Sequence, residues 1–421
     1  MAKYTRLTGT QDILPEEQRY WEHFRQTVAQ VALDYGFDRI DLPIFEMTEL
    51  FARGVGENTD IVEKEMYSFQ DKGDRDITLR PEFTAGVVRA YIENGLHVQP
   101  KPVKLYSIGP AFRYERPQAG RYRQLHQYNA EIIGESGPMA DLEIMLMAWD
   151  IYARLDFQGL AFQLNATGCP ACRPTYIETL AAHYRARQDA LCDDCLRRLE
   201  QNPLRLLDCK REACQGHIAA APKITAHLCA ECDAHFAELR GFLDDLGRPY
   251  TLNHTLVRGL DYYTKTVFEV WAEGIGAQSA VCGGGRYDGL IELIGGPATP
   301  AVGFAAGIER AVLVMKEQDV EVPALPTPPV YIAYLGDACR QYAVRLLVRL
   351  REAGLGAQIA MGGSLRSQLR HANKRDARFA LIIGEDEMAA DVVMVRDLHA
   401  GDQETVAQDA LIATLRSRLD A

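Results

Sequence analysis

Residues 103–134 read VKLYSIGPAFRYERPQAGRYRQLHQYNAEIIG and predict two β-strands joined by a polar loop. Side chains on a strand alternate between its two faces, so every second residue of the later strand shares one side. That side carries Leu125, Gln127, Asn129 and Glu131. Two amides and a carboxylate are unusual on a face that packs into a core, and they indicate the wall of a polar pocket.

The loop between these two strands is rich in arginine. Arg113 closes the first strand, and the loop adds Arg116, Arg121 and Arg123. Guanidinium groups offer paired donors in a fixed geometry that suits polyphosphate ligands. Taken alone, the loop is better explained as a solvent-exposed hairpin tip, so the phosphate interpretation needs support from elsewhere in the chain.

A second unusual stretch, residues 256–270, reads LVRGLDYYTKTVFEV. Its ends have the composition of a strand, but it also holds an arginine, an aspartate and two tyrosines, and buried charges need partners. Residues 282–290, CGGGRYDGL, have the bare backbone of a binding floor, although most glycine runs are turns. The chain has no P-loop and no G-x-G-x-x-G after a strand, so a nucleotide would bind to an unrelated scaffold.

The bulk properties are those of a globular protein with more than one domain. The chain has 421 residues, which is too many for one hydrophobic core. Its residues are 47% hydrophobic and 25% charged, which is ordinary for a globular protein. Its start lacks an apolar secretory segment and no stretch reaches the length of a membrane span, so we expect a cytoplasmic protein with no membrane partner. The net charge of -12 argues against a generally basic nucleic-acid binder.

Hydrophobic periodicity and the positions of prolines indicate how the chain is organised. An amphipathic helix is expected at about 16–36, and a strand bent at Pro43 over 37–51. The proline-rich segment 322–330 is the best linker candidate, and it divides the chain into expected domains at 1–325 and 326–421. The second has the strand and helix alternation of a small α/β domain. Its basic helix at 364–375 is either a solvated face or a phosphate contact.

Eight of the ten cysteines fall in one stretch, at about 167–240, which interrupts the pattern as an inserted module. Three C-x-x-C pairs are among them, and in a reducing compartment this spacing suggests structural zinc rather than disulfides. The alternative is a set of reduced cysteines left over from a former metal site. The eight are Cys169, Cys172, Cys192, Cys195, Cys209, Cys214, Cys229 and Cys232.

Together these segments resemble a class II histidyl-tRNA synthetase along nearly the full length of the chain. DLPIFE around Pro43, the hairpin FRYERPQAGRYRQLHQYNAEIIG and VGFAAGIER, which ends at Arg310, are similar to the three class II signature motifs. LVRGLDYYTKTVFEV and GGGRYDGL resemble segments particular to the histidine enzyme, and RPE at 80–82 strengthens the match. The resemblance implies an α/β protein: an α+β catalytic core with a mainly antiparallel sheet flanked by helices, a cysteine-rich insertion and a C-terminal α/β anticodon-binding domain.

The resemblance also implies a histidine-binding pocket. The positions expected to hold the α-amino group of L-histidine are Glu82, Thr84 and Gln127, and those expected to address the two ring nitrogens are Glu131 and Tyr263. Tyr262 is expected to shape the pocket, and Arg258 to reach the bound histidine as well. One position departs from the family, since Phe83 stands where many relatives carry glycine. Its ring could alter access beside Thr84 or pack outward.

For the chemistry, the resemblance implies activation of histidine by ATP to histidyl-adenylate and transfer of histidine to tRNA(His). Arg113 and Arg258 are the expected catalytic groups on either side of the α-phosphate. Arg310 is expected at the γ-phosphate and Arg121 at the bent triphosphate tail, with Mg bridging the outer phosphates. The family also implies a homodimer.

Two other functions fit parts of the chain. A non-catalytic regulatory paralogue of the ATP phosphoribosyltransferase of histidine biosynthesis shares the catalytic core, but it usually lacks the anticodon domain and the key arginines, which are present here. A class II synthetase for proline or threonine should lack the RGLDYY stretch. We therefore expect the histidine enzyme.

Overall fold

The structure is a computed structural model that describes residues 4–56, 59–118, 120–274 and 280–420. The chain forms two compact units, Met1–Pro323 and Ala324–Ala421. The boundary lies within the proline-rich segment 322–330. In the part of the chain that the structure describes, no helix combines the length and apolar character that crossing a bilayer requires.

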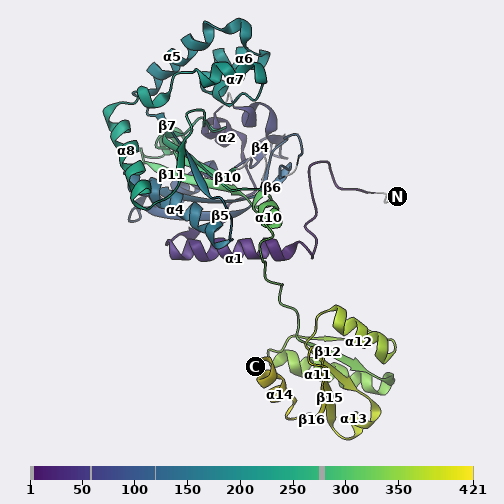
Figure 1. Ribbon diagram of the computed structural model, residues 1–421. Coiled ribbons are helices and arrows are strands. Elements are labelled where there is room, and N and C mark those ends of the chain that lie inside the picture. The colour runs from purple at the N-terminus through teal and green to yellow at the C-terminus, as the bar shows by residue number, and fades with distance from the viewer. Residues whose placement is uncertain (1–3, 57–58, 119, 275–279, 421) are drawn as a thin grey trace. The chain divides into compact units, whose positions relative to one another are not determined.

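The first unit is built on an eight-stranded sheet with the order β1-β5-β6-β11-β10-β9-β7-β8 (Figure 1). The pairs β1–β5 and β7–β8 are parallel, and all pairs between β5 and β7 are antiparallel. The predicted mainly antiparallel sheet is therefore confirmed. The strands are β1 (Asp38–Arg39), β5 (Val103–Phe112), β6 (Gln124–Ile133), β7 (Ala161–Gly168), β8 (Tyr250–Leu252), β9 (Thr264–Trp271), β10 (Ala280–Arg286) and β11 (Ala301–Gly307).

The register of the central strands brings glycines beside an acidic residue. In β11, Gly303 pairs with Glu131 of β6 on one side and with Gly285 of β10 on the other. Because glycine carries no side chain, the space above this part of the backbone, where a strand would normally present a Cβ, is left for neighbouring groups such as Glu131 and Tyr263. The pairing places that space at the centre of the sheet.

A small second sheet, in the order β2-β4-β3, lies in the same unit. The strand expected over 37–51 is only partly correct: Pro43 separates two short strands, and the chain continues as helix α2 from Thr48. Proline cannot donate a ladder hydrogen bond, so pairing stops there. The elements of this region are β2 (Phe45–Met47), α2 (Thr48–Val55), the π-helix η1 (Ile61–Glu65), β3 (Tyr67–Gln70), β4 (Asp76–Leu79), α3 (Thr84–Glu93) and the 3-10 helix η2 (Leu96–Val98).

Helices cover one face of the large sheet and form the main core. The predicted helix α1 (Gln18–Asp34) buries Trp21, Phe24, Val28 and Val31, the apolar positions of its periodic pattern. Burial of each such side chain contributes roughly 1.5–3 kcal/mol. The same core includes α4 (Pro138–Arg154), α8 (Ala230–Asp245) and α10 (Ile308–Glu317), whereas α3 and α9 (Leu290–Leu293) pack in a separate cluster with β5.

The cysteine-rich insert leaves the sheet after β7 and returns through α8. Figure 1 shows its helices α5, α6 and α7 as a lobe at one end of the first unit. Leu180, Tyr184, Leu199 and Leu206 are among the buried residues of its own small core. Its elements are α5 (Arg173–Arg185), η3 (Gln188–Ala190), α6 (Asp193–Gln201), η4 (Pro203–Asp208), α7 (Glu212–Ala219) and η5 (Ile224–Ala226).

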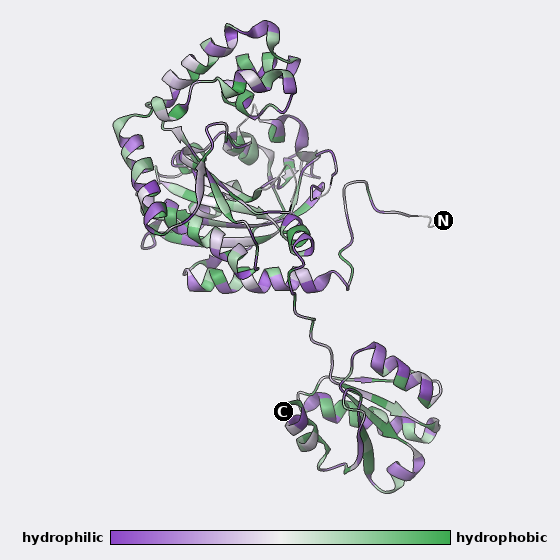
Figure 2. Ribbon diagram, in the orientation of Figure 1, coloured by the Kyte–Doolittle hydropathy of each residue, from purple (hydrophilic) through white to green (hydrophobic). Residues whose placement is uncertain are grey.

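The second unit is a five-stranded sheet in the order β13-β12-β14-β15-β16, parallel among its first three strands and antiparallel after them. Of α12, only Gln368 and Ala372 are buried, and Figure 2 shows this helix as largely hydrophilic. The elements are β12 (Val330–Tyr334), α11 (Gly336–Glu352), β13 (Ala357–Ile359), α12 (Leu365–Lys374), β14 (Phe379–Ile383), α13 (Glu385–Ala389), β15 (Val392–Asp397), β16 (Gln403–Ala407) and α14 (Leu411–Leu419).

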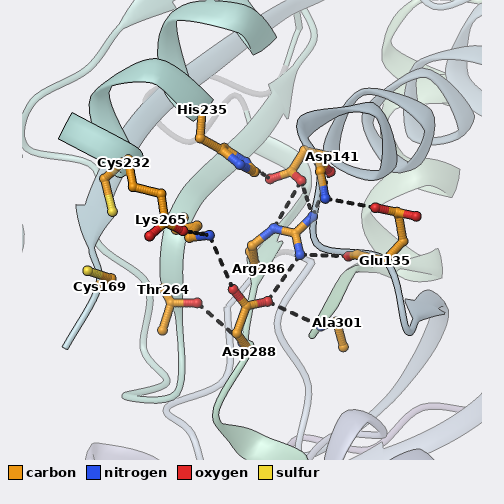
Figure 3. Close-up of polar contacts among 12 residues, drawn as sticks. Glu135, Asp141, Cys169, Cys232, His235, Thr264, Lys265, Arg286, Asp288 and Ala301 are labelled. Atoms are coloured by element: carbon orange, nitrogen blue, oxygen red, sulfur yellow. Dashed lines mark hydrogen bonds and ion pairs between the residues drawn. The ribbon is translucent and has the colours of Figure 1, made fainter. Parts of the chain in front are cut away.

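A buried ion-pair network holds α4 and α8 against the end of β10 (Figure 3). Arg286, 0% exposed, donates from Nε to Asp141 Oδ2 at 3.0 Å and from Nη2 to the Gly137 carbonyl at 3.0 Å. His235 Nε2 of α8 lies 3.2 Å from the other Asp141 oxygen. The guanidinium and the carboxylate thus have partners throughout, which offsets the large cost of burying them.

Replacing Asp141 with Asn should destabilise the first unit by about 3–5 kcal/mol, because Arg286 would keep its buried charge and lose its main counterion. Urea unfolding followed by tryptophan fluorescence measures this, since Trp21, Trp149 and Trp271 are the only tryptophans of the chain and lie in that unit. Glu49→Gln, which breaks an exposed pair with Arg53, should change the free energy of unfolding by less than about 1 kcal/mol. Equal effects of the two changes would contradict the argument.

Candidate active site

Two adjoining cavities open over the glycine-lined part of the large sheet. The inner one has a volume of about 120 Å³ and the outer one about 600 Å³. Arg113, Gln127 and Arg258 line both. The inner cavity is further lined by Glu82, Thr84, Glu131, Tyr262 and Tyr263, and the outer by Arg121 and Arg310. The structure therefore brings together all ten residues that the sequence predicted for histidine and ATP.

Glu131 forms the floor of the inner cavity and accepts hydrogen bonds from three side chains. Its Oε1 accepts from Thr84 Oγ1 at 2.9 Å and from Asn129 Nδ2 at 3.1 Å, and its Oε2 accepts from the Tyr287 hydroxyl at 2.6 Å. A Cβ at Gly303 would lie 1.6 Å from Glu131 Oε2, so only glycine at this position leaves room for the carboxyl group.

Burial dominates the acid strength of Glu131. The side chain is 1% exposed, and desolvation raises its pKa to about 8, although Tyr287, Asn129 and Thr84 donate hydrogen bonds that favour the ionised form. Glu82 is similar, since burial raises its pKa against hydrogen bonds from the backbone N–H groups of Ala85 and Thr84 at 2.9 and 2.6 Å. Two such carboxyl groups beside one small cavity are ready to receive a cationic or N–H-rich ligand.

The aromatic side of the inner cavity comes from residues 256–270, the stretch of mixed composition. Only its second part, from Thr264, is strand, and residues 256–263 follow no regular element. Tyr262 and Tyr263 contact each other with ring centroids 4.8 Å apart, and Tyr262 also contacts Tyr287 at 5.6 Å. The irregular backbone lets two consecutive tyrosines face one cavity, which the alternation of a strand would prevent.

Arg258 lies at the boundary between the two cavities. It forms an ion pair with Glu269. Burial is the largest single effect and lowers the pKa of the guanidinium, but Glu269 together with Tyr263 and other neighbouring groups outweighs it, so the pKa is raised. A Cβ at Gly283 would lie 2.6 Å from Arg258 Cζ. The glycine run of residues 283–285 is therefore the bare floor that its composition suggested, and one of its functions is to make room for a guanidinium.

The other arginines surround the outer cavity at different depths. Arg113 donates from Nε to the Pro81 carbonyl at 2.8 Å, and Arg310 donates from Nη1 to the Ala280 carbonyl at 2.7 Å. Arg121, nearly half exposed, lies 3.7 Å from Glu115. Backbone carbonyls orient Arg113 and Arg310, and Arg113 also lies 3.8 Å from Glu115. Both guanidinium groups line the outer cavity, where they can bind an anionic ligand.

Phe83, which departs from the family pattern, neither lines the inner cavity nor packs outward. It is 2% exposed, and the Arg80 guanidinium lies 4.0 Å from its ring centre. Arg80 in turn donates to the carbonyls of Pro110 and Leu42. The Phe83 ring therefore supports a buried arginine that connects β5 to the start of the small sheet.

Sequence reasoning missed three groups that complete the site. Tyr287, in the segment GGGRYDGL, donates a hydrogen bond to Glu131, and Glu269 forms an ion pair with Arg258. Glu309 accepts a hydrogen bond from the His126 backbone N–H at 3.0 Å. Glu269 lies in the stretch 256–270 and Tyr287 in the stretch 282–290. The polar character of these two side chains within strand-like or glycine-rich sequence was the signal that could have identified them. Their partners could not be assigned from the sequence: Tyr287 and Glu131 lie in different segments, and Arg258 meets Glu269 only because residues 256–263 fold back irregularly before β9.

The eight cysteines of the insert fall into two separate sets of four. In each set the four sulfurs lie within 4.8 Å of one another, and all eight cysteines are free of disulfides. One set is Cys169, Cys172, Cys229 and Cys232, and the other is Cys192, Cys195, Cys209 and Cys214.

Comparison with known proteins agrees with this architecture. A solved structure of apo histidyl-tRNA synthetase from S. aureus superposes with a TM-score of 0.83 and 38% identity, covering 98% of this chain and 99% of that one. The first unit therefore has the fold of an aminoacyl-tRNA synthetase.

The sequence profile described as histidyl-tRNA synthetase matches residues 9–311, and the profile described as anticodon binding domain matches residues 329–418. The histidine–tRNA ligase of Desulforamulus reducens is 50% identical over 98% of this chain and 99% of its own length. That of Pelotomaculum thermopropionicum is 48% identical over 99% and 98%. The chain belongs to the histidyl-tRNA synthetase family, as its motifs predicted.

The raised pKa of Glu131 predicts a specific pH dependence of stability. In the unfolded chain Glu131 ionises near 4.5, whereas in the fold it stays protonated up to about 8. Its contribution to stability is therefore complete below the first value and is lost as pH rises through the second. As pH rises across that range, the free energy of unfolding of Glu131→Gln should increase relative to that of the wild type by up to about 1.4 kcal/mol per pH unit.

Urea unfolding of both proteins at intervals between these two pH values measures the difference. Glu93→Gln, an exposed carboxyl on α3, serves as the control and should keep a constant difference from the wild type. A Glu131→Gln difference that does not change with pH would show that the buried carboxyl is already ionised.

Proposed function

We propose that the chain is a histidine–tRNA ligase, which activates L-histidine with ATP and transfers it to the 3′ end of tRNA(His). The observation that carries this proposal is the pair of joined cavities, one of about 120 Å³ and one of about 600 Å³, with Arg113 and Arg258 lining both. An amino acid in the inner cavity would direct its carboxylate to the boundary, where it meets the phosphates of a nucleotide in the outer one.

The inner cavity has the chemistry to select an imidazole ring. A neutral ring donates from one nitrogen and accepts at the other. Glu131 and Tyr263, which line the same cavity, supply an acceptor and a hydroxyl for these two nitrogens. A side chain without a ring N–H would occupy the cavity and leave Glu131 desolvated without a ligand donor, and this penalty supports strong discrimination.

The α-amino group of histidine is assigned to the opposite wall. Glu82 lines this wall, and the Thr84 and Ala85 backbone N–H groups at the N-terminus of α3 donate to its carboxyl group. Among the residues that the structure describes, Gln127 Oε1 is buried and has no hydrogen-bond partner. A buried acceptor without a partner is costly, so an ammonium group donating to it would recover that cost on binding.

Activation then needs positioning and charge stabilisation more than proton transfer. A carboxylate oxygen of histidine attacks the α-phosphorus of ATP, the bond from this phosphorus to the bridging oxygen breaks, and pyrophosphate leaves with the electron pair. Arg113 and Arg258 stabilise the negative charge at the α-phosphate from two sides. Arg310 and Arg121 hold the outer phosphates.

Magnesium, when bound, neutralises charge on the β- and γ-phosphates. The outer cavity includes carboxylates, Glu115 and Glu309 among them, which are the hard oxygen ligands that this ion takes together with phosphate. In the second step a terminal ribose hydroxyl of tRNA attacks the carbonyl carbon of histidyl-adenylate and AMP leaves.

We assign residues 1–325 to catalysis and residues 326–421 to anticodon binding, supported by the match of the second unit to the anticodon binding domain profile. Arg366, Arg370, Lys374 and Arg375 lie exposed on or next to α12 and are the candidates for contact with tRNA phosphates. A homodimer, a cytoplasmic location and structural zinc in the insert complete the proposal, the first two on family grounds.

The regulatory paralogue is the weaker assignment. A protein that only binds histidine needs the inner cavity, but not an outer cavity with Arg113, Arg121 and Arg310 along its wall. Its function would also not require a second unit that matches an anticodon binding domain. Both features favour the ligase.

The proposal predicts that the purified chain exchanges labelled pyrophosphate into ATP only when histidine is present. Arg258→Ala should lower the exchange rate by roughly 10²–10³-fold, because one preorganised charge at the reacting phosphate would be lost. Exchange is measured by the label recovered in ATP. Exchange driven equally by proline or threonine, or absent with every amino acid, would refute the assignment.

The matched control for this variant is Arg116→Ala. Arg116 belongs to the arginine-rich loop, but it is exposed and does not line either cavity. It should exchange pyrophosphate at close to the wild-type rate. A similar loss in both variants would mean that exchange needs positive charge near the site in general rather than a guanidinium at the cavity boundary.

The basic helix α12 can be tested separately. Replacing both Arg366 and Arg370 with Glu should raise the KM for tRNA in aminoacylation by about tenfold or more, because attractive phosphate contacts become repulsive. Pyrophosphate exchange without tRNA should be unchanged. Arg340→Glu, an exposed arginine on α11, is the control. An unchanged KM for tRNA in the double variant would exclude α12 from the contact.

A further inference from the structure

The spacing of sulfurs in both cysteine sets is that of a tetrahedral metal site. Cys169 Sγ lies 3.8 Å from both Cys172 Sγ and Cys229 Sγ, and Cys172 Sγ lies 3.9 Å from Cys232 Sγ. Zinc bound to four thiolates at about 2.3 Å places neighbouring sulfurs about 3.8 Å apart. A disulfide needs about 2.05 Å between sulfurs. The sulfurs therefore surround a space of the size that one zinc ion requires.

The other set shows the same spacing, with Cys192 Sγ and Cys209 Sγ 3.8 Å apart. Cys195, Cys209 and Cys214 are buried, and in this lobe they belong to the small core of the insert. Four soft thiolates in a closed, mostly buried arrangement are the ligand set of structural zinc sites. Each set is complete by itself, so the insert has two separate sites rather than one shared cluster.

The first set closes the base of the insert. Cys169 and Cys172 follow β7 at the start of α5, where the chain leaves the sheet, and Cys229 and Cys232 lie at the start of α8, where it returns. An ion bound by all four would join the two ends of the insert. It would also fix the residues next to its ligands, because a bound metal orients the backbone that carries them.

Those neighbours contact Tyr263 and the first residues of β9. Arg173, next to Cys172, donates to the Tyr263 carbonyl and, at 2.9 Å, to the Thr167 carbonyl. Glu231, between the two cysteines of α8, forms an ion pair of 2.9 Å with Lys265. Lys265 has a left-handed backbone, with φ of 50°, so this position is strained and needs support from its surroundings.

Figure 3 shows how this contact continues into the sheet. Lys265 Nζ lies 4.0 Å from Asp288, which accepts from Arg286 Nη1 at 3.1 Å. Arg286 is the buried arginine bound to Asp141. Through these contacts, the first cysteine set supports both the Tyr263 wall of the inner cavity and the glycine-rich strand β10.

The second set supports the other end of the same stretch. Between its cysteines, Asn202 donates to Asp261 at 2.9 Å and Arg205 donates to the Arg258 carbonyl at 3.4 Å. Arg205 and Arg198 also pair with Asp60 at 3.0 and 3.3 Å, and all three line the outer cavity. Arg205 lies in η4, and Cys209 directly follows this helix, so the position of the second cysteine set governs where Arg205 meets the wall.

We propose that the insert binds two zinc ions, one in each cysteine set, and that the two ions brace the segment RGLDYYTK from opposite ends. The ion of the first set supports Tyr263 and thus histidine binding. The ion of the second set supports the backbone of Arg258 and the wall of the ATP cavity. The metal sites stand on their own geometry, and their effect on substrates rests on the proposed ligase function.

Metal analysis of full-length protein prepared without chelator should find two zinc ions per chain. Cys169→Ser with Cys229→Ser should lower this to one, and so should Cys192→Ser with Cys209→Ser. Cys339→Ala, in the core of the second unit, is the control and should keep both. Zinc near zero in the wild type, or iron in its place, overturns the proposal independently of any activity.

If a double variant does not fold, wild-type protein loaded with cobalt(II) gives a second measurement. Tetrahedral cobalt–thiolate sites have intense charge-transfer absorption, which should increase until two ions per chain are bound. A plateau at one ion per chain, or octahedral cobalt spectra, overturns the two-site assignment.

Pyrophosphate exchange separates the effects of the two sites. Loss of the first should raise the KM for histidine by at least about tenfold with little change for ATP. Loss of the second should raise the KM for ATP by at least about tenfold, with a smaller rise for histidine because Arg258 lines both cavities. Equal KM changes in both variants, or none, would refute the bracing. Wild-type exchange with histidine is measured first, so failure of the ligase assignment is recognised separately from failure of the metal sites.

Discussion

Two ionisable side chains lie directly against glycine backbone at the centre of the large sheet, and the whole site depends on that contact. Glu131 occupies the space that a Cβ at Gly303 would fill, and Arg258 occupies the space above Gly283. The two glycines belong to adjacent antiparallel strands, β11 and β10. Because these strands lack side chains there, a carboxyl group and a guanidinium share one floor within a sheet that is closely packed elsewhere.

Burying such groups is expensive, and the fold offsets the cost by giving each one fixed partners. Glu131 has three donors, and Arg258 has the Glu269 carboxylate. On the covered face of the same sheet, Arg286 and Asp141 use the same solution. The benefit is preorganisation, because groups that cannot rotate or rehydrate do not need to reorganise when charge develops on a bound ligand. A rigid polar floor and a tightly packed lower face are therefore parts of one design.

The insert extends this logic beyond the sheet. Residues 256–263 follow no regular element, so no strand ladder holds Arg258 and Tyr263 in position. Contacts from the insert replace it, through Arg205 and Asn202 at one end and Arg173 and Glu231 at the other. A compact module with a small core of its own gains rigidity from metal–thiolate ligation more readily than from additional apolar burial.

Local features of the chain could be predicted from its sequence alone. Side-chain alternation, which depends only on backbone geometry, put Gln127 and Glu131 on one face, and helical periodicity identified the buried side of α1. The motifs then indicated the family. Only the tertiary structure decided that Tyr287 reaches Glu131 across 156 positions, that Glu269 pairs with Arg258, and that eight cysteines divide into two sets of four. These pairings depend on strand register and on where the insert returns to the sheet, and spacing along a chain carries no information about either.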